Sequence, residues 1–309
     1  MEKSIIASRV ILSSDLSPQF LNFWPIAAQS WRSIFGITPT LVLVSRKPIS
    51  SSLMKKLNEF GDVHSLVSTS SAPLPNQAKM ARWYIAGKLT GELVTIEDID
   101  TMYLSSDYLL ERLSHFQEGM LLGIGNDVNQ DDPDYKGKFP ASNLTGTADT
   151  FQEFFNSAST ESFEEFLNRF KGMRMLDNRE DPFNKPNRFS DESLIRALRE
   201  NHKSELIKTI PRKVDIQTEW MDRSWWPIDG EIPKKAILVN LPRPLYNNQK
   251  RCKSLMQIYF GKSYPWMIDR KSNIWENPDH PFRLMLRKLV IVFMSKLKMT
   301  IDKNRKVTP

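Results

Sequence analysis

Short apolar runs alternate with amphipathic stretches along residues 1 to about 125. The apolar runs are rich in β-branched and aliphatic residues and predict strands at residues 9–14, 39–45, 62–68 and 93–96. Between them, apolar residues recur at helical spacing and predict helices at residues 20–31, 51–60 and 79–90. This alternation is typical of an α/β fold with a mainly parallel sheet flanked by helices. Ligands of such sheets bind at the carboxyl ends of the strands, where we expect Asp15 and Asp98.

Two carboxylates, Asp98 and Asp100, follow the strand at residues 93–96. If strand geometry persists, side chains at i and i+2 leave the same face, so two oxygen ligands can converge on one divalent cation. The adjacent Glu97 is then expected on the opposite face. The alternative interpretation is a solvated turn or a helix cap. Two serines come next and predict a helix that begins at Asp107.

This strand, acidic loop and helix resemble the metal-binding segment of the GT-A fold glycosyltransferases. In these nucleotide-sugar enzymes an Asp-x-Asp motif ties a metal to the donor diphosphate. The segment is most similar to that of bacterial and large-virus polysaccharide glycosyltransferases, which runs roughly as DIDMxPxSxxY. The matching residues are Asp98, Ile99, Asp100, Ser105 and Tyr108. The chain departs from the pattern at Thr101 and Tyr103, where the family has Met and Pro.

The resemblance implies a metal-dependent glycosyltransferase that moves a sugar from a nucleotide-diphosphate sugar to a glycan or lipid-linked glycan acceptor. It implies Mn²⁺ or Mg²⁺ held by Asp98 and Asp100, with Asn240 where many such enzymes have a third ligand, a His. An Asn carbonyl can ligate a hard cation but brings no charge. The implied donor-binding residues are Asp15, Gln77, Lys79, Arg82, Asp98 and Asp100. Lys79 and Arg82 are three residues apart, so we expect them to share a helix face.

The resemblance places the acceptor side between residues 126 and 260. Asp191 and Glu192 begin a predicted helix there, and either is a candidate catalytic base. The alternative is simple helix capping. Trp225 and Trp226 are candidate acceptor-binding residues because indole rings stack on sugar faces, although tryptophan clusters are more often part of a core.

The expected layout is one GT-A-like domain followed by a tail. The catalytic domain covers residues 1–260, with a donor half at about 1–125 and an acceptor half at about 126–260. A basic helical C-terminal extension covers residues 261–309. Beyond residue 126, helices are predicted after Thr147, at residues 162–173, and from Ser190 to about residue 200.

The composition of the chain indicates the cellular compartment in which we expect the protein. The chain has 309 residues, of which 40% are hydrophobic and 26% charged, as in soluble globular proteins. The lone Cys252 cannot form an internal disulfide, which suits a reducing compartment. The N-terminus lacks the pattern of a secretory signal, and no apolar run reaches the roughly 20 residues that cross a bilayer. We therefore expect a cytoplasmic protein.

The net charge of +7 is concentrated near the C-terminus, where Lys and Arg stand beside aliphatic residues at 282–306. This segment predicts at most a reversible, peripheral contact with an anionic membrane. The alternative is a packed helix with a solvated basic face. Nucleic acid is not an expected partner, because aromatic residues are not interleaved with the basic ones.

Two other functions are compatible with the sequence. A two-metal phosphodiesterase or nuclease also uses clustered carboxylates, but it needs about four of them. A non-catalytic binding protein that kept the glycosyltransferase fold is the other alternative, and Asn240 is its best argument. The chain has no phosphate-binding P-loop, no serine-nucleophile motif and no paired-His zinc motif.

Overall fold

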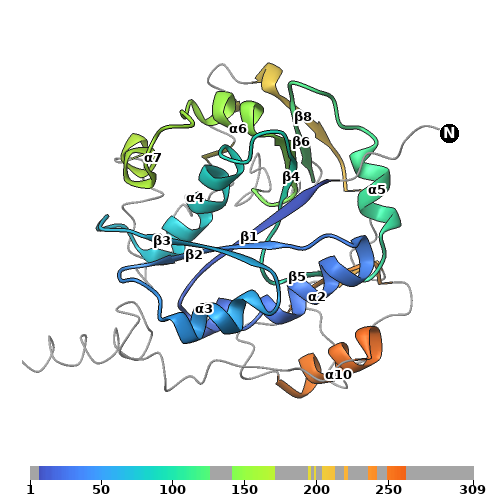
Figure 1. The fold of residues 1–309 in the computed structure, drawn as a ribbon. Helices are drawn as coiled ribbons and strands as arrows, with labels where there is room; N and C mark the ends of the chain where they lie inside the picture. Colours follow the sequence, from blue (N-terminus) through green and yellow to red (C-terminus); the bar gives the residue numbers. More distant parts are fainter. Residues whose placement is uncertain are drawn as a thin grey trace, which may run out of the picture.

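The computed structural model describes residues 7–125, 141–170, 194–195, 198–199, 204–212, 219–221, 236–241 and 249–261. The main sheet contains β1 (Arg9–Asp15), β2 (Thr40–Ser45), β3 (Asp62–Val67), β4 (Leu93–Ile96), β6 (Leu121–Ile124), β7 (Leu144–Thr147) and β8 (Ile207–Ile210). These strands pair in the order β3-β2-β1-β4-β7-β6-β8 (Figure 1). Only β7 is antiparallel to its neighbours, β4 and β6. The prediction of an α/β fold with a mixed, mainly parallel sheet flanked by helices is confirmed.

The central strands are buried on both faces, which explains their continuous apolar sequences. Because side chains alternate along a strand, Leu12 and Leu41 face the core shared with α2 (Trp24–Phe35) and α3 (Ser51–Asn58). Ile11 and Val42 face the other core, which is shared with α4 (Leu74–Ala86), α6 (Ala148–Phe155) and α7 (Phe163–Arg169). Figure 1 shows α2 and α3 on one side of the sheet and α4, α6 and α7 on the other. Two further helices, α5 (Asp107–Leu113) and α10 (Gln249–Phe260), add to the first core.

Prolines set two helix boundaries that differ from the prediction. The helix expected at residues 20–31 is two helices, α1 (Pro18–Leu21) and α2, and Pro25 lies in the first turn of α2. α4 begins at Leu74, well before residue 79, with Pro75 in its first turn. The start of α7 agrees with the prediction. This helix follows Ser162, which caps it and forms a capping box with Glu165.

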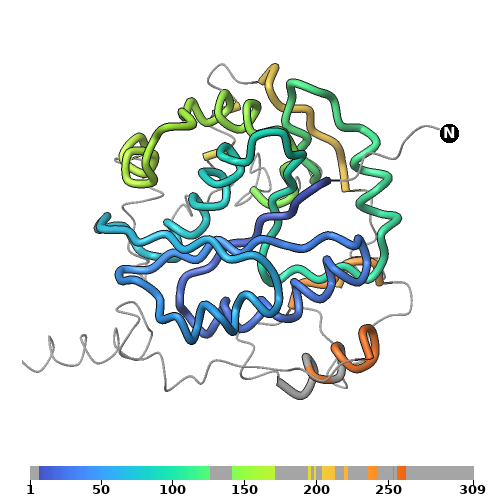
Figure 2. Tube along the Cα trace, viewed as in Figure 1, coloured from blue at the N-terminus to red at the C-terminus, as the bar shows by residue number. Residues whose placement is uncertain are grey.

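A second, small sheet was not predicted. It consists of β5 (Thr101–Tyr103), β10 (Leu238–Asn240) and β9 (Trp220–Met221), in the order β5-β10-β9. β10 runs antiparallel to β5 and parallel to β9. Figure 2 shows β10, coloured orange, beside β5. The two strands are neighbours in space although they are far apart in the sequence. The pairing brings Asn240 next to the end of the acidic loop.

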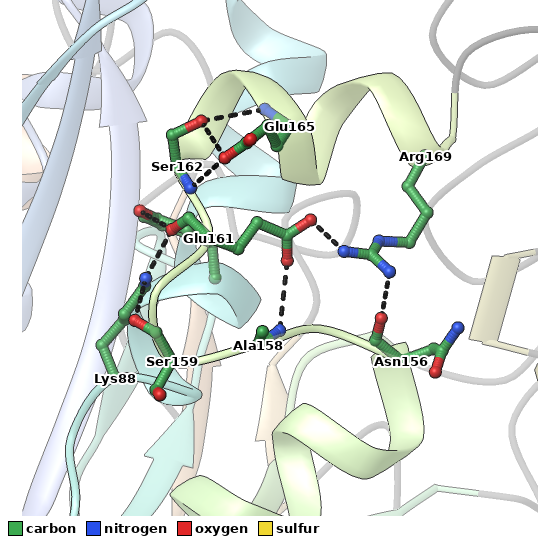
Figure 3. Close-up of polar contacts among 9 residues, drawn as sticks. Lys88, Asn156, Ala158, Ser159, Glu161, Ser162, Glu165 and Arg169 are labelled. Atoms are coloured by element: carbon green, nitrogen blue, oxygen red, sulfur yellow. Dashed lines mark hydrogen bonds and ion pairs between the residues drawn. The ribbon is translucent and has the colours of Figure 1, made fainter.

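The connection between α6 and α7 is tied to α4 (Figure 3). Lys88, just after α4, donates hydrogen bonds of 2.5 Å from Nζ to the carbonyl oxygens of Ser159 and Glu161. The Tyr84 hydroxyl donates to the same Glu161 carbonyl at 2.9 Å. The carboxylate of Glu161 forms an ion pair with Arg169 of α7. These contacts fix α4 at its C-terminal end against the neighbouring helices.

Glu164 of α7 holds the loop that follows β3. Its Oε1 accepts hydrogen bonds from the Ser68 hydroxyl and the Thr69 backbone N–H, both at 2.7 Å. Partial burial acts to raise the pKa of Glu164, but these hydrogen bonds outweigh it, so the pKa lies below the ordinary value of 4.5. The loop at the carboxyl end of β3 is therefore held by a charged acceptor.

Parts of the expected layout fall outside the described residues. Of the predicted extension at 261–309, only Gly261 is described. Within the described part of the chain, no helix is long and apolar enough to cross a membrane. The division into donor and acceptor halves stays a prediction.

Replacing Glu164 with Gln should make the free energy of unfolding less dependent on pH in the acidic range. In the wild type the folded-state pKa is depressed, so the carboxylate contributes stability above about pH 4.5, and this contribution is lost as the pH falls through the folded-state pKa. The variant keeps an acceptor oxygen but has no carboxylate to protonate. We expect the stability advantage of the wild type over Glu164→Gln to shrink between about pH 6 and about pH 3, measured by urea unfolding.

The matched control is Glu118→Gln, which removes an exposed carboxylate outside this loop. Its stability difference from the wild type should change less across the same pH range. A difference between wild type and Glu164→Gln that does not vary with pH would contradict the prediction.

Candidate functional site

The candidate site lies at the carboxyl ends of β1 and β4, which are parallel neighbours in the sheet. Ile11 of β1 pairs with Ile96 of β4, and the Glu97 N–H donates to the Ile11 carbonyl at 3.0 Å. β1 continues along β2 as far as Asp15, a buried residue whose Oδ1 accepts the Ser17 N–H at 2.9 Å. Asp15 and the acidic loop therefore follow adjacent strands at the same edge of the sheet, as expected.

The acidic loop is a turn, so the strand geometry predicted for its carboxylates does not persist. β4 ends at Ile96, and the Thr101 N–H donates to the Asp98 carbonyl at 3.1 Å. Asp100 is fully buried, whereas the side chain of Asp98 is 39% exposed. The chain turns here because its next residues join β10 in the second sheet. The two carboxylates thus lie in different environments and do not leave one strand face.

Arg82 reaches the acidic turn from α4. Its Nη1 donates to Asp98 Oδ1 at 2.7 Å and lies 3.3 Å from the Glu97 carbonyl oxygen, which also accepts from it. The Arg82 side chain is only 3% exposed. A cation buried to this extent requires a compensating negative charge, and Asp98 supplies it. Arg82 therefore lies at the acidic turn, and its predicted role in binding the donor stays a prediction.

The other two residues proposed on α4 are Lys79 and Gln77. Lys79 is exposed whereas Arg82 is buried, although the two residues are three positions apart on α4. The reason is that α4 packs against the sheet and turns the Arg82 side inward. Gln77 is fully buried, and its Nε2 donates to the carbonyl oxygens of Ser70 at 3.3 Å and Ala72 at 2.6 Å. This amide holds the loop after β3.

Glu97 is a buried carboxyl beside the two aspartates. Its Oε1 accepts the Asp98 N–H at 2.8 Å, and its Oε2 lies 2.7 Å from the Tyr103 hydroxyl. Burial, and next the charge of Asp98, raise the pKa of Glu97 to about 7, although the Tyr103 and Asp98 hydrogen bonds and the charge of Arg212 act to lower it. Burial and the neighbouring Glu97 likewise raise the pKa of Tyr103 well above its ordinary value.

The Tyr103 hydroxyl contacts two oxygens, those of Glu97 Oε2 and Asn143 Oδ1, the second at 3.0 Å. A hydroxyl has a single proton to donate. Both contacts are hydrogen bonds when Glu97 is protonated and donates to Tyr103, which then donates to Asn143. Turning the Asn143 amide to present its nitrogen satisfies the ionised form as well. Either arrangement keeps the carboxyl in a closed hydrogen-bond network.

Asn240 lies beside the acidic turn, where its backbone pairs with Thr101. Its Oδ1 accepts a hydrogen bond from the indole Nε1 of Trp220. An indole N–H can only donate, so the orientation of the Asn240 amide is defined by its chemistry. The oxygen expected to ligate a metal therefore already accepts one hydrogen bond.

Arg212, which contacts Trp220, is a residue of this region that the sequence analysis missed. Arg212 is buried after the end of β8, and its Cζ lies 4.2 Å from the centroid of the Trp220 ring. Its charge also lowers the pKa of Glu97. Arg212 comes soon after the end of the short strand β8, and position near a strand end was the signal available for it.

Four candidates fall on residues outside the described part of the chain. They are the proposed bases Asp191 and Glu192 and the proposed acceptor-binding residues Trp225 and Trp226. Their roles stay predictions.

The residues of the turn are suited to a cation that is shared with a bound ligand. Among the described residues, no group of three or more His, Cys, Asp or Glu side chains could hold a metal ion. Mg²⁺, however, is commonly bound by one or two carboxylates together with substrate phosphates. Asp98 and Asp100 offer this oxygen chemistry, which fits Mg²⁺ or Mn²⁺ arriving with a phosphate-bearing ligand.

Comparisons with known proteins give similar folds but no sequence match. No protein-family model and no curated protein matches the chain. It is similar to a galactosyltransferase LgtC in complex with donor and acceptor sugar analogues, at 10% identity and a TM-score of 0.46, over 80% of this chain and 95% of that one. It is also similar to the bifunctional glycosyltransferase WbbM in its apo form, at 8% identity and a TM-score of 0.43, over 82% of this chain and 50% of that one. The glycosyltransferase GlyE of Streptococcus pneumoniae matches at 15% identity and a TM-score of 0.33, over 71% of this chain and 68% of that one. Because these TM-scores are below 0.5, the function must be argued from the site itself.

Proposed function

We propose that this protein is a metal-dependent glycosyltransferase that moves a sugar from a nucleotide-diphosphate sugar to a glycan or lipid-linked glycan acceptor. The observation that supports it best is the acidic turn after β4, in which Asp98 is paired with the buried Arg82 and Asp100 is fully buried. Such a turn at the carboxyl edge of a mainly parallel sheet is where phosphate-bearing ligands of α/β proteins bind.

Within this proposal, Asp98 and Asp100 would hold Mn²⁺ or Mg²⁺, which when bound neutralises charge on the departing diphosphate. Arg82 keeps Asp98 in place through its hydrogen bond to Oδ1. Asp15 is held by the Ser17 N–H at the end of β1 and is proposed to contact the donor. In this proposal these side chains orient the donor at its phosphate end.

The acceptor half is proposed from the resemblance alone. Asp191 or Glu192 would accept a proton from the acceptor hydroxyl, and Trp225 and Trp226 would stack on its sugar. The basic segment at 282–306 would give a peripheral contact with anionic membrane, where lipid-linked acceptors are found. A cytoplasmic location belongs to the same proposal.

A non-catalytic binding protein with this fold is the second candidate, and Asn240 is the observation that favours it. The residue in the expected position of a third metal ligand is an amide whose oxygen accepts from Trp220. A binding protein would be stabilised by a nucleotide without turning over any nucleotide sugar. A nuclease is less well supported, since no cluster of three or more potential ligands occurs within the described ranges.

Replacing Asp100 with Asn should abolish the metal-dependent part of nucleotide binding. The substitution preserves the volume of a fully buried side chain, which Ala would not, and removes one negative charge from the proposed cation site. The wild type should gain about 2.7 kcal/mol of stability at a ligand concentration of 100 times Kd. We expect uridine, guanosine or thymidine diphosphate with Mn²⁺ to raise the Tm of the wild type but not that of Asp100→Asn.

The control is Asp149→Asn, which removes an exposed aspartate from the first turn of α6. It should respond to nucleotide and Mn²⁺ as the wild type does. A metal-dependent rise in Tm that persists in Asp100→Asn would remove Asp100 from the proposed site.

Replacing Arg82 with Lys should weaken nucleotide binding although the charge is kept. Lysine is a compact point charge and cannot reproduce the contacts of a guanidinium with both Asp98 and the Glu97 carbonyl. A hydrogen bond to a charged group contributes roughly 1.5–3 kcal/mol, so the loss should be about tenfold or more in Kd. Isothermal titration with Mn²⁺ and the nucleotide that raises Tm most would measure it.

Arg112→Lys provides the matched control. Arg112 is a buried arginine of α5 whose Cζ lies 5.4 Å from the centroid of the Tyr108 ring. Its replacement perturbs a buried cation outside the acidic turn. Equal losses of affinity in the two variants would show that Arg82 has no specific role in the site.

A further inference from the structure

The buried carboxyl of Glu97 fixes the backbone of the acidic turn by a hydrogen bond. The residue is 1% exposed, and its Oε1 accepts the N–H of Asp98 at 2.8 Å. Asp98 is also the first residue of the turn, because its carbonyl accepts the Thr101 N–H. One carboxyl oxygen therefore fixes the backbone of a residue whose side chain is proposed to meet the cation.

The other carboxyl oxygen of Glu97 is fixed through Tyr103, which α2 holds in place. The Tyr103 hydroxyl lies 2.7 Å from Glu97 Oε2. The backbone N–H of Tyr103 donates to Ser30 Oγ at 2.9 Å, and that hydroxyl donates back to the Tyr103 carbonyl at 2.9 Å. The Tyr103 ring packs against Trp31 and Phe35 with centroids 5.1 and 5.4 Å apart. Glu97 is thus coupled to a rigid aromatic layer.

Asn143 completes the network from the neighbouring strand connection. It has a φ of 62°, a backbone conformation that few residues other than Gly, Asn and Asp adopt. Its N–H donates to the Ile96 carbonyl at 2.8 Å, and its Oδ1 lies 3.0 Å from the Tyr103 hydroxyl. The contacts of Asn143 therefore anchor both the end of β4 and the ring that holds Glu97.

We propose that Glu97 is a positioning residue, which through Tyr103 and Asn143 holds the Asp98 turn in the shape that binds a divalent cation together with a nucleoside diphosphate. The role rests on the proposed function, since it concerns the same site. Groups that orient metal ligands without touching the metal influence affinity through the ligand they hold. Glu97 acts in this way on the backbone of Asp98.

A second buried polar pair in the same strand provides a control for stability. Thr95 Oγ1 lies 2.9 Å from Thr145 Oγ1, fully buried between β4 and β7. The pair supports the sheet, and no contact of its hydroxyls reaches the turn. Thr95→Val removes it while preserving the shape of the side chain, so it destabilises the same strand without altering the hydrogen bonds of Glu97.

The test compares Glu97→Met, Glu97→Gln, Tyr103→Phe and Thr95→Val with the wild type. Met matches the length of Glu but accepts no strong hydrogen bond, whereas Gln keeps an acceptor for the Asp98 N–H and a donor for Tyr103. Tyr103→Phe removes the hydroxyl alone and serves if Glu97→Met does not fold. Titration calorimetry with uridine, guanosine or thymidine diphosphate and Mn²⁺ measures affinity, and hydrogen exchange measures protection of the Asp98 amide.

We expect Glu97→Met and Tyr103→Phe to weaken binding of Mn²⁺ with the nucleotide by about tenfold, in the range found for residues that orient metal ligands. Glu97→Gln and Thr95→Val should stay within about twofold of the wild type, because both keep the hydrogen bond to the Asp98 N–H and also the contact with the Tyr103 hydroxyl that fixes its acceptor. Protection of the Asp98 amide should fall in Glu97→Met, which loses the acceptor of that N–H, and not in Thr95→Val.

Two negative results are distinguishable. If the wild type binds none of the nucleotides with Mn²⁺, the proposed function fails, and the positioning role fails with it. If the wild type binds but Glu97→Met and Tyr103→Phe lose no more affinity than Thr95→Val, the proposed function stands and the positioning role is overturned.

Discussion

The ion pair between Arg82 and Asp98 joins the helical layer to the acidic turn, and the geometry of the site depends on it. Arg82 is almost fully buried, and a buried cation that loses its charged partner destabilises the folded state. α4 must therefore stay where its guanidinium reaches the turn. Lys88 and Glu161 maintain that position at the far end of the helix. Although Asp98 is paired with Arg82, its side chain is still 39% exposed and thus partly accessible to a ligand.

The turn is held from the opposite side of the sheet as well. Glu97 receives the Asp98 N–H, and Tyr103 connects that carboxyl to α2. A turn fixed from both helical layers has little conformational freedom to lose when a ligand binds, so less binding free energy is spent on ordering it. This arrangement has a cost in stability, because it buries the carboxyl of Glu97, whose pKa is raised to about 7. The structural role of Glu97 in the turn accounts for a carboxyl at this buried position.

The sequence predicted the main sheet well because β1, β2 and β4 are buried on both faces and read as continuous apolar runs. It could not predict β5, whose three residues are a strand only because Asn240 and its neighbours pair with them from far along the chain. That pairing also turns the chain and separates the environments of Asp98 and Asp100. Arg82 was predicted in the site because its helix resembles the donor-facing helix of the family, whereas no motif or resemblance indicated Arg212, whose contact with Trp220 depends on the folded positions of both residues.

The charges around the turn constrain which ligands it can accept. Asp15, Asp98 and Asp100 lie at one edge of the sheet, and Asp98 is paired with Arg82. Arg212 adds a second buried cation but faces the Trp220 ring and influences Glu97. A diphosphate that approached these carboxylates alone would meet like charge at short range, where a low dielectric makes the repulsion large. A divalent cation that arrives with the diphosphate reverses this balance, and for that reason the proposed function requires metal and nucleotide to bind together.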